Sequence, residues 1–405
     1  MIFSKGSIMP RASILSAVLL ATVLFPLHGL AQIDKDPSIY RPINPEELEK
    51  LKRQITEEMR SNVELLGDYH YESGDLNNRL DFFRTGAKLT YKWTSATRFY
   101  LSGVETRYLT QDDSYDGWGT NLTLGVRSAL SDAVRVQAEL GGTYFSTDTT
   151  SVNGLASINF APSDTVNLYV TASRSNVEES LLSATGLRPR TGPFARELVG
   201  QVMETKGVAG GTVKLPYKFD ALAEGGVGTR DGSHVGSNFF GQARGGVGYD
   251  VISGVDDKPL SFLRVSYQLT YFGFEDDRLG FGGASLLTAD GRHTINPALL
   301  GSDGISPSPS SGNPGVGGYF SPQYFISNIA RVDLAGRPVE ALSYRLSAFA
   351  GTQNYTDSST QGVGGFSVSL DYALNDRFSI PVSFRFDNLG PFNQLTLSVR
   401  LVIKL

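Results

Sequence analysis

Histidine is the side chain best suited to proton transfer near neutral pH, and beyond the first 31 residues it occurs at His70, His234 and His293. His234 directly follows Ser233 and lies close to Asp231, which brings together the residue types of a base, a nucleophile and an orienting acid. Such a set acts only when a folded framework holds the side chains within hydrogen-bond reach. These neighbours fall in a polar, loop-like segment, so we predict no catalytic residues and no enzyme activity.

Metal and cofactor chemistry has little support either. Asp290 stands near His293, but the histidines lie far apart in the sequence and no acidic cluster joins them. Asp112, Asp113 and Asp116 could hold calcium weakly, but a solvated loop explains them better. The glycine repeats do not open a helix, as a phosphate-binding loop would require. We therefore predict neither a metal nor a cofactor.

The composition excludes further classes of protein. The 405 residues include 45 glycines and no cysteine, so disulfides and thiolate chemistry are absent. The formal net charge is −5, and it becomes more negative if Lys5 and Arg11 are removed by processing. A mildly acidic chain argues against nucleic acid as a partner.

The first 31 residues have the features of a secretory signal peptide. Lys5 and Arg11 give a positive start, residues 14–25 form an apolar core, and Ala31 closes a small-residue cleavage site. The apolar core is too short to span a bilayer as a helix, which needs about 20 residues. We therefore expect residues 1–31 to be removed and the mature protein to be exported.

From about residue 61 the chain alternates between apolar and polar residues, as a strand does when its two faces meet different surroundings. Charged residues on the polar face would each cost several kcal/mol in a dry core without partners, but little in water. The last segment shows the pattern most clearly. One face carries Leu395, Leu397, Val399, Leu401, Ile403 and Leu405, and the other carries Gln394, Thr396, Ser398, Arg400, Val402 and Lys404.

The number and spacing of these segments favour a membrane barrel over a soluble β-sandwich. Roughly sixteen strand-like segments follow residue 61, and an even number is typical of bacterial outer-membrane barrels. We predict an all-β, transmembrane antiparallel β-barrel over residues 61–405, in the outer membrane of a Gram-negative-type bacterium and with its short turns in the periplasm. The longer polar links on the other rim include 146–151, 177–206, 229–236 and 274–317.

Residues 32–60 form a linker before this barrel. Asn44 can cap a helix and Pro45 suits its first turn, so we predict one short helix over about 45–60. Its apolar residues form a narrow stripe. Three interpretations remain open, namely a periplasmic helix on the barrel rim, a plug inside the lumen and the remnant of a lost periplasmic domain.

Strand parity selects the side chains that would line a water-filled interior. They are polar or charged residues that stand between apolar neighbours. Their mixed signs favour a neutral or weakly anionic polymer as the transported species. The candidates are Arg264, Gln268, Arg345, Asp371, Arg385, Arg400 and Lys404.

The motif at residues 317–325 reads Gly-Gly-Tyr-Phe-Ser-Pro-Gln-Tyr-Phe. It resembles the GGYFSPQ signature in the barrel domain of the C-subunit family of bacterial cellulose synthases. The start of the barrel is also similar to that family, with a charged helix that leads into Gly67, Tyr69 and Tyr71. The resemblance implies an outer-membrane conduit for a β-glucan. Its partners would be the polysaccharide chain, periplasmic synthase subunits, outer-membrane lipid and the barrel assembly machinery.

The chain departs from that family in two respects. A long array of tetratricopeptide repeats precedes the family's barrel, whereas here only a short stretch separates the expected cleavage site from the predicted helix. Docking to a synthase would then fall to other subunits, or the barrel would serve a different pathway. The last residue, Leu405, also replaces the terminal Phe that is common in such barrels.

The predicted topology places the motif at the start of the twelfth strand, at the outer rim. There Tyr319, Phe320, Tyr324 and Phe325 would offer aromatic faces to sugar rings, with Gln323 as a hydrogen-bonding partner. The alternative is structural, with the rings joining an aromatic girdle at the membrane interface.

Three functional hypotheses follow from this sequence. The first is a passive channel that exports a cellulose-like glucan or a related exopolysaccharide. The second is a general diffusion porin for small solutes, and the third is a structural or adhesive barrel that acts through its outer loops. The 274–317 loop suits each of them, because it can remain outside or fold inward as a constriction.

Overall fold

The structure is a computed structural model that describes most of the strand-rich part of the chain. The predicted signal peptide (1–31), the linker helix (about 45–60, Arg60 apart) and most of the 274–317 loop lie outside the described residues. The described residues are 60–74, 80–109, 116–179, 181–186, 188, 196–253, 258–275, 286–287, 294–295, 322–356, 358–389 and 392–405.

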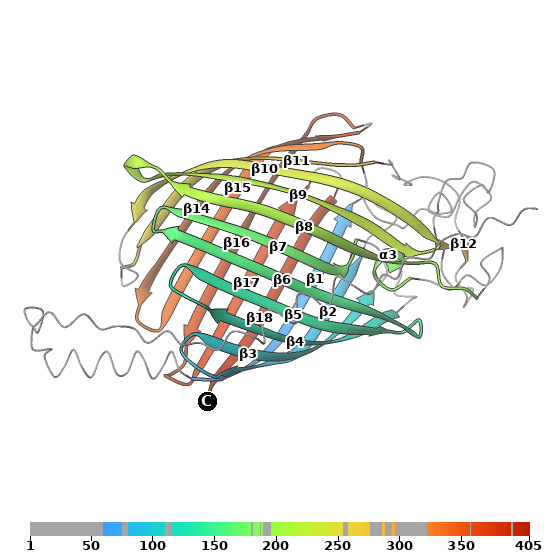
Figure 1. Cartoon of the computed structure of the whole chain (residues 1–405), viewed down its shortest axis with the longest axis horizontal. Helices are drawn as coiled ribbons and strands as arrows, with labels where there is room; N and C mark the ends of the chain where they lie inside the picture. The colour runs from blue at the N-terminus through green and yellow to red at the C-terminus, as the bar shows by residue number, and fades with distance from the viewer. Residues whose placement is uncertain are drawn as a thin grey trace, which may run out of the picture. The chain divides into compact units, whose positions relative to one another are not determined.

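Sixteen of the described strands form one closed antiparallel barrel, in which each strand pairs with its neighbours along the chain and β1 closes on β18 (Figure 1). The order around the barrel is β1 (Asn62–Gly74), β2 (Asp81–Lys92), β3 (Thr97–Leu109), β4 (Asp116–Ala129), β5 (Val134–Phe145), β6 (Thr149–Ser163), β7 (Val166–Asn176), β8 (Gly200–Lys214), β9 (Phe219–Ser233), β10 (Val235–Ser253), β11 (Phe262–Phe274), β14 (Phe325–Val339), β15 (Leu342–Tyr355), β16 (Gln361–Ala373), β17 (Phe378–Asn388) and β18 (Phe392–Lys404).

Four smaller elements of the described chain accompany the barrel strands. The short strands β12 (Leu286–Leu287) and β13 (Thr294–Ile295) pair with each other, so β14 is the twelfth strand of the barrel, as the sequence predicts. A one-turn helix, α3 (Leu181–Ala184), lies between β7 and β8, and the 3-10 helix η2 (Pro216–Lys218) joins β8 to β9. Among the described residues, none of the helices has the length and hydropathy that crossing a bilayer requires.

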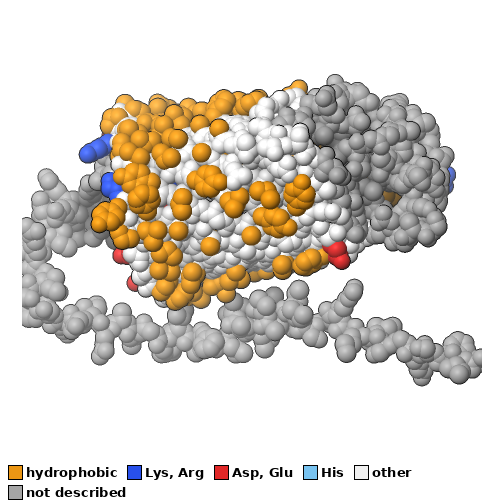
Figure 2. Space-filling model, turned by 90° about the horizontal axis from the view of Figure 1, so that it is seen from above, with side chains coloured by type: hydrophobic (Ala, Val, Ile, Leu, Met, Phe, Trp, Pro, Cys, Tyr) orange, Lys and Arg blue, Asp and Glu red, His pale blue; other side chains and the backbone are white. Residues whose placement is uncertain are grey.

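The outer wall is apolar, as alternation predicts. On β4, β5 and β7 the outward positions carry large hydrophobic side chains that are more than half exposed, such as Leu124, Leu140 and Val170. Figure 2 shows hydrophobic side chains spread over this wall, with charged atoms near its two ends. The barrel strands have 11 to 19 residues, whereas about 9–11 residues suffice to cross the hydrocarbon. The wall therefore spans a bilayer with residues to spare.

Short turns close one rim of the barrel, and their side chains explain the tight geometry. Thr94 Oγ1 accepts hydrogen bonds from the backbone amides of Ala96 (3.2 Å) and Thr97 (2.9 Å) in the β2–β3 turn. In the β16–β17 turn, Asn375 Oδ1 accepts hydrogen bonds from the backbone amides of Arg377 and Phe378. These polar turns lie where the sequence predicts them, on the rim that also holds the C-terminus (Figure 1).

Two predicted outer loops are wrong. The 146–151 link is a tight turn over residues 146–148, and the 229–236 link leaves only His234 between β9 and β10. His234 takes a positive φ of 54°, which reverses the chain within one residue. Both hairpins are rich in polar residues because the strands continue beyond the hydrocarbon, where neither face needs to be apolar. The polarity of these segments marks the edge of the membrane and not the end of the strand.

Candidate functional site

The connection between β7 and β8 folds into the mouth of the barrel opposite the short-turn rim, and we call its described part, residues 177–179, 181–186, 188 and 196–199, the inner loop. Its helix α3 is enclosed: Leu182 is 3% exposed and Ala184 is fully buried. A Cβ added to Gly117, on the inward face of β4, would lie 2.9 Å from Leu181 of this helix. The inner loop therefore packs against the inside of the wall.

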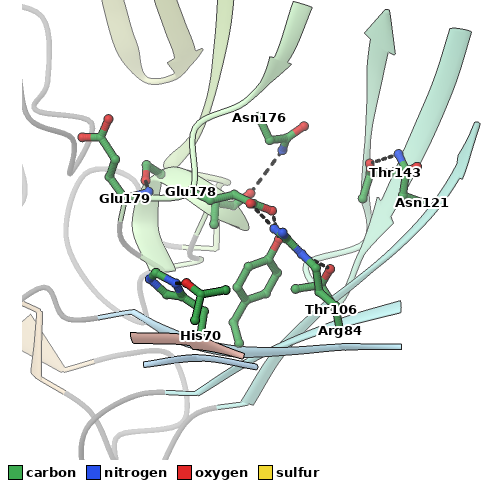
Figure 3. Close-up of polar contacts among 12 residues, drawn as sticks. His70, Arg84, Thr106, Asn121, Thr143, Asn176, Glu178 and Glu179 are labelled. Atoms are coloured by element: carbon green, nitrogen blue, oxygen red, sulfur yellow. Dashed lines mark hydrogen bonds and ion pairs between the residues drawn. The ribbon is translucent and has the colours of Figure 1, made fainter. Parts of the chain in front are cut away.

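Two consecutive glutamates tie the inner loop to opposite sides of the barrel. Glu178 forms an ion pair with Arg84 on β2 and accepts a hydrogen bond from Tyr108 Oη on β3 at 2.8 Å (Figure 3). Glu179 pairs with Arg230 on β9 at 2.8 Å. Strands β2 and β9 lie seven steps apart around the sixteen-strand ring. The two ties therefore hold the chain across the lumen.

Each tying arginine is itself fixed from the barrel side. Arg84 donates to Thr106 Oγ1 at 3.3 Å and lies over the ring of Phe82 at 4.2 Å. Arg230 lies over Phe274 at 5.1 Å and also pairs with Glu204 at 2.8 Å. A guanidinium held over an aromatic face and against a second partner loses little additional side-chain freedom when it binds a carboxylate. Both anchors are therefore preorganised.

Apolar contacts and hydrogen bonds from side chains to backbone carbonyls also hold the inner loop in place. Leu181 and Ala184 pack on a cluster that comprises Leu80, Phe82 and Tyr108. The carbonyl of Thr185 accepts a hydrogen bond from Thr147 Oγ1 at 3.0 Å, and that of Ala184 accepts one from Asn176 Nδ2 at 3.3 Å. A second cluster lines the β8–β11 side of the mouth and consists of Val177, Val202, Val235, Phe240 and Phe274, with Phe272 packed against it.

A glycine makes the close approach of the inner loop possible. Gly200 has a φ of +90°, and a Cβ at this position would lie 2.2 Å from the carbonyl oxygen of Leu182. We expect Gly200→Ala to displace the inner loop and to increase tryptic cleavage at Arg188 severalfold, because strained backbone of this kind costs about 1–3 kcal/mol. Limited proteolysis of the folded protein in detergent measures the effect. Gly207→Ala on the same strand, where a Cβ meets nothing within 4 Å, should leave cleavage unchanged.

Closer to the short-turn rim than the inner loop, two tyrosines each reach across a glycine on the neighbouring strand to a glutamate on the strand beyond it. Tyr100 on β3 lies across Gly125 on β4 and donates a hydrogen bond to Glu139 on β5. Tyr169 on β7 is opposite Gly210 on β8 and donates to Glu224 on β9. In each case the glycine provides the space for the tyrosine ring. The two rings differ in exposure, because Tyr100 is buried with Lys88 Nζ 4.7 Å from its ring centre, whereas Tyr169 is partly exposed.

Some of the residues predicted to line the lumen lie on a common cavity, and others form ion pairs with neighbouring carboxylates. Arg345, Asp371 and Arg400 line one cavity of about 620 Å³. Arg264 is held between Asp220 at 2.5 Å and Asp250 at 3.1 Å. Parity and register place all of them on the inward face.

The remaining predicted lumen residues have the same parity. Arg385 donates to Asp387 at 2.6 Å near the inner-loop end of β17, and Gln268 donates to Thr270 at 3.0 Å on β11. Lys404 lies opposite Asn62, where β18 closes the barrel at the short-turn rim. Contact of any of these side chains with a transported molecule stays a prediction.

The aromatic motif is split by the structure. Tyr319 and Phe320 lie outside the described residues. Phe325 stacks on Phe272 with 4.5 Å between ring centroids, next to the apolar cluster of the mouth. Tyr324 is 38% exposed and shares the parity of the outward residues of β14, while Gln323 is exposed just before the strand. Sugar contact by these residues also stays a prediction.

Sequence reasoning missed the inner loop and its two arginine anchors. The 177–206 segment looked like an ordinary polar link, although it contains Glu178-Glu179 followed by the apolar run Leu181-Leu182. An apolar run inside a long polar outer loop is the signal that could have indicated inward folding, because such residues gain from burial.

A closed β-barrel with an apolar wall, a polar interior and short turns on one rim is an outer-membrane channel. The family model described as "Cellulose synthase operon protein C C-terminus" matches residues 74–282, which is more than half of the chain. The chain belongs to this family. The matched segment does not include the motif at 317–325, so the two observations reach the same family from different residues.

The chain is similar to several solved structures, of which the first shares its fold. A "bacterial polysaccharide outer membrane secretin" aligns with a TM-score of 0.57 at 12% identity, over 86% of this chain and 99% of that one. The "CymD monoaromatic hydrocarbon channel" aligns with a TM-score of 0.44 at 8% identity, over 85% and 88%. The "outer membrane protein OprD from Pseudomonas aeruginosa" gives 0.34 at 13% identity, over 85% and 93%. A search of curated proteins finds no match.

Proposed function

We propose that this channel exports a cellulose-like glucan or a related exopolysaccharide across the outer membrane. The family match over residues 74–282 is the observation that carries the proposal, because the family is named for the cellulose synthase operon. The solved structure aligned with a TM-score of 0.57 is itself named as a polysaccharide secretin. Periplasmic synthase subunits are the proposed partners on the short-turn side.

The interior suits a hydrated glycan that moves without covalent chemistry. The inward faces carry hydroxyls and amides such as Ser157, Thr171 and Gln268, which can exchange weak hydrogen bonds with sugar hydroxyls. The partly exposed ring of Tyr169 offers an apolar face for the CH face of a sugar. Each contact is individually weak, so a chain can advance while its contacts exchange. The inner loop must move aside for the polymer to leave.

Single-channel recordings in planar bilayers test this function. Cello-oligosaccharides added on the short-turn side are expected to interrupt the current in discrete events whose frequency rises with concentration. Maltose, which is too short to occupy several contacts at once, is the control and should leave the current unchanged. A channel that conducts ions and ignores every oligosaccharide would instead be a general diffusion porin.

A further inference from the structure

A second cavity, of about 630 Å³, lies inside the barrel at the short-turn rim between β3 and β6. Three arginines line it, Arg98, Arg127 and Arg135, together with the amides of Gln137 and Asn159 and several serine hydroxyls. All three arginines are exposed. We call this cavity, with its three arginines, the arginine pocket.

The strand register concentrates positive charge in the arginine pocket. Arg98 on β3 lies directly opposite Lys92 on β2 on one side and Arg127 on β4 on the other. Three neighbouring strands therefore place a cation at the same level of the wall. Like charges directly opposite each other destabilise a sheet, so this row is costly unless something negative offsets it.

Among the described residues, the lining of the arginine pocket itself holds no negative charge. No carboxylate lines the arginine pocket, and none of the described acidic side chains forms an ion pair with its three arginines. Glu139, two residues beyond Gln137 on β5, accepts hydrogen bonds from both Tyr100 and Gln137. Two other lumen arginines are paired, since Arg244 pairs with Glu224 at 2.7 Å and Arg264 pairs with two aspartates, and the cavity that Arg345 and Arg400 line includes Asp371.

We propose that the arginine pocket binds anionic groups (carboxylate, sulfate or phosphate) carried by the translocated glycan as it enters the barrel. The assignment rests on the export function proposed above and names a substrate class for it. Guanidinium groups bind such oxyanions in a bidentate manner. The amides of Gln137 and Asn159 suit sugar hydroxyls, and the guanidinium of Arg127 lies 5.5 Å from the centre of the ring of Tyr100, a buried residue on the inward face of β3. A site on the inner wall beside this ring favours a chain inside the lumen over an acidic protein docked on the rim.

The test compares oligogalacturonate with cello-oligosaccharide of equal length, each added on the short-turn side of the full-length protein in a bilayer. In the wild type, oligogalacturonate should block at about tenfold lower concentration, because three ion pairs of a few-fold each combine. The triple variant Arg98→Gln/Arg127→Gln/Arg135→Gln should lose this preference, and high salt should weaken it. Binding of fluorescent oligogalacturonate to the detergent-solubilised barrel gives a readout that does not require an open channel.

A matched variant removes three charges from the same rim but outside the arginine pocket: Lys218→Gln/Lys258→Gln/Arg377→Gln, all at exposed turn positions. It should keep the preference for the anionic sugar. If block is equal for both sugars, or if the preference survives in the pocket variant, the arginine assignment is overturned while the export function stands. If neither sugar blocks or binds, the export function fails and the assignment fails with it. An acidic peptide of equal charge that blocks as well as oligogalacturonate would overturn the glycan assignment in favour of a protein partner.

Discussion

Replacing both Arg84 and Arg230 by glutamine should raise the ratio of open to closed channels about thirtyfold, since two ion pairs of about 1 kcal/mol each are lost. The pairs with Glu178 and Glu179 are partly exposed, which keeps each contribution near this modest value. Lys206 remains beside Glu204 at 2.8 Å, so that carboxylate keeps a partner and the barrel should still fold. Open probability in single-channel recordings measures the change.

Arg107→Gln is the matched control for this double variant. Arg107 pairs with Glu105 at 3.0 Å on the outer face of β3, and its side chain is 69% exposed. Its loss should leave the open probability unchanged. If the double variant gates like the wild type, the inner loop does not depend on its two arginine anchors, and the apolar clusters must hold it in place alone.

Val170→Arg should destabilise the barrel in lipid by about 2–4 kcal/mol, because it places a charge against the hydrocarbon near the middle of the wall. Val170 lies near the centre of β7, is 58% exposed, and has Ile158 and Ala209 as its cross-strand neighbours. Denaturant titration of the barrel folded into lipid vesicles gives the free energy of unfolding.

The neighbouring position provides the control. Thr171 faces the lumen, where its hydroxyl shares a hydrogen bond of 3.0 Å with Ser157. Thr171→Arg introduces the same charge one residue away but into water, so its cost should stay within about 1 kcal/mol, the value of the hydrogen bond it removes. Equal losses for Val170→Arg and Thr171→Arg would contradict the assignment of the two faces.

The barrel itself could be predicted because its rule is local. On β17 and β18 every second residue meets lipid, so the order of residue types along a single strand reveals which face is which. The antiparallel pairs join strands that follow each other along the chain, and short turns fix which strands those are. Arg345, Asp371 and Arg400 could thus be assigned to one interior from parity alone, and the structure places them on one cavity.

The inner loop could not be predicted because its contacts are remote in sequence. Glu178 reaches Arg84 across 94 residues, and nothing near either residue in the sequence indicates the other. The prediction of long outer loops at 146–151 and 229–236 was wrong for a different reason. The polarity of a residue follows its surroundings, and outside the bilayer both strands and loops are surrounded by water. Polar residues there do not distinguish a strand from a loop.

The adjacency of Glu178 and Glu179 has a mechanical consequence. The two tethers start from neighbouring residues, so a displacement of the peptide bond that joins these residues strains both ion pairs at once. Tension on the chain from either wall is therefore transmitted directly to the opposite tether. We therefore expect the channel to switch between two conductance levels in one step, without intermediate levels.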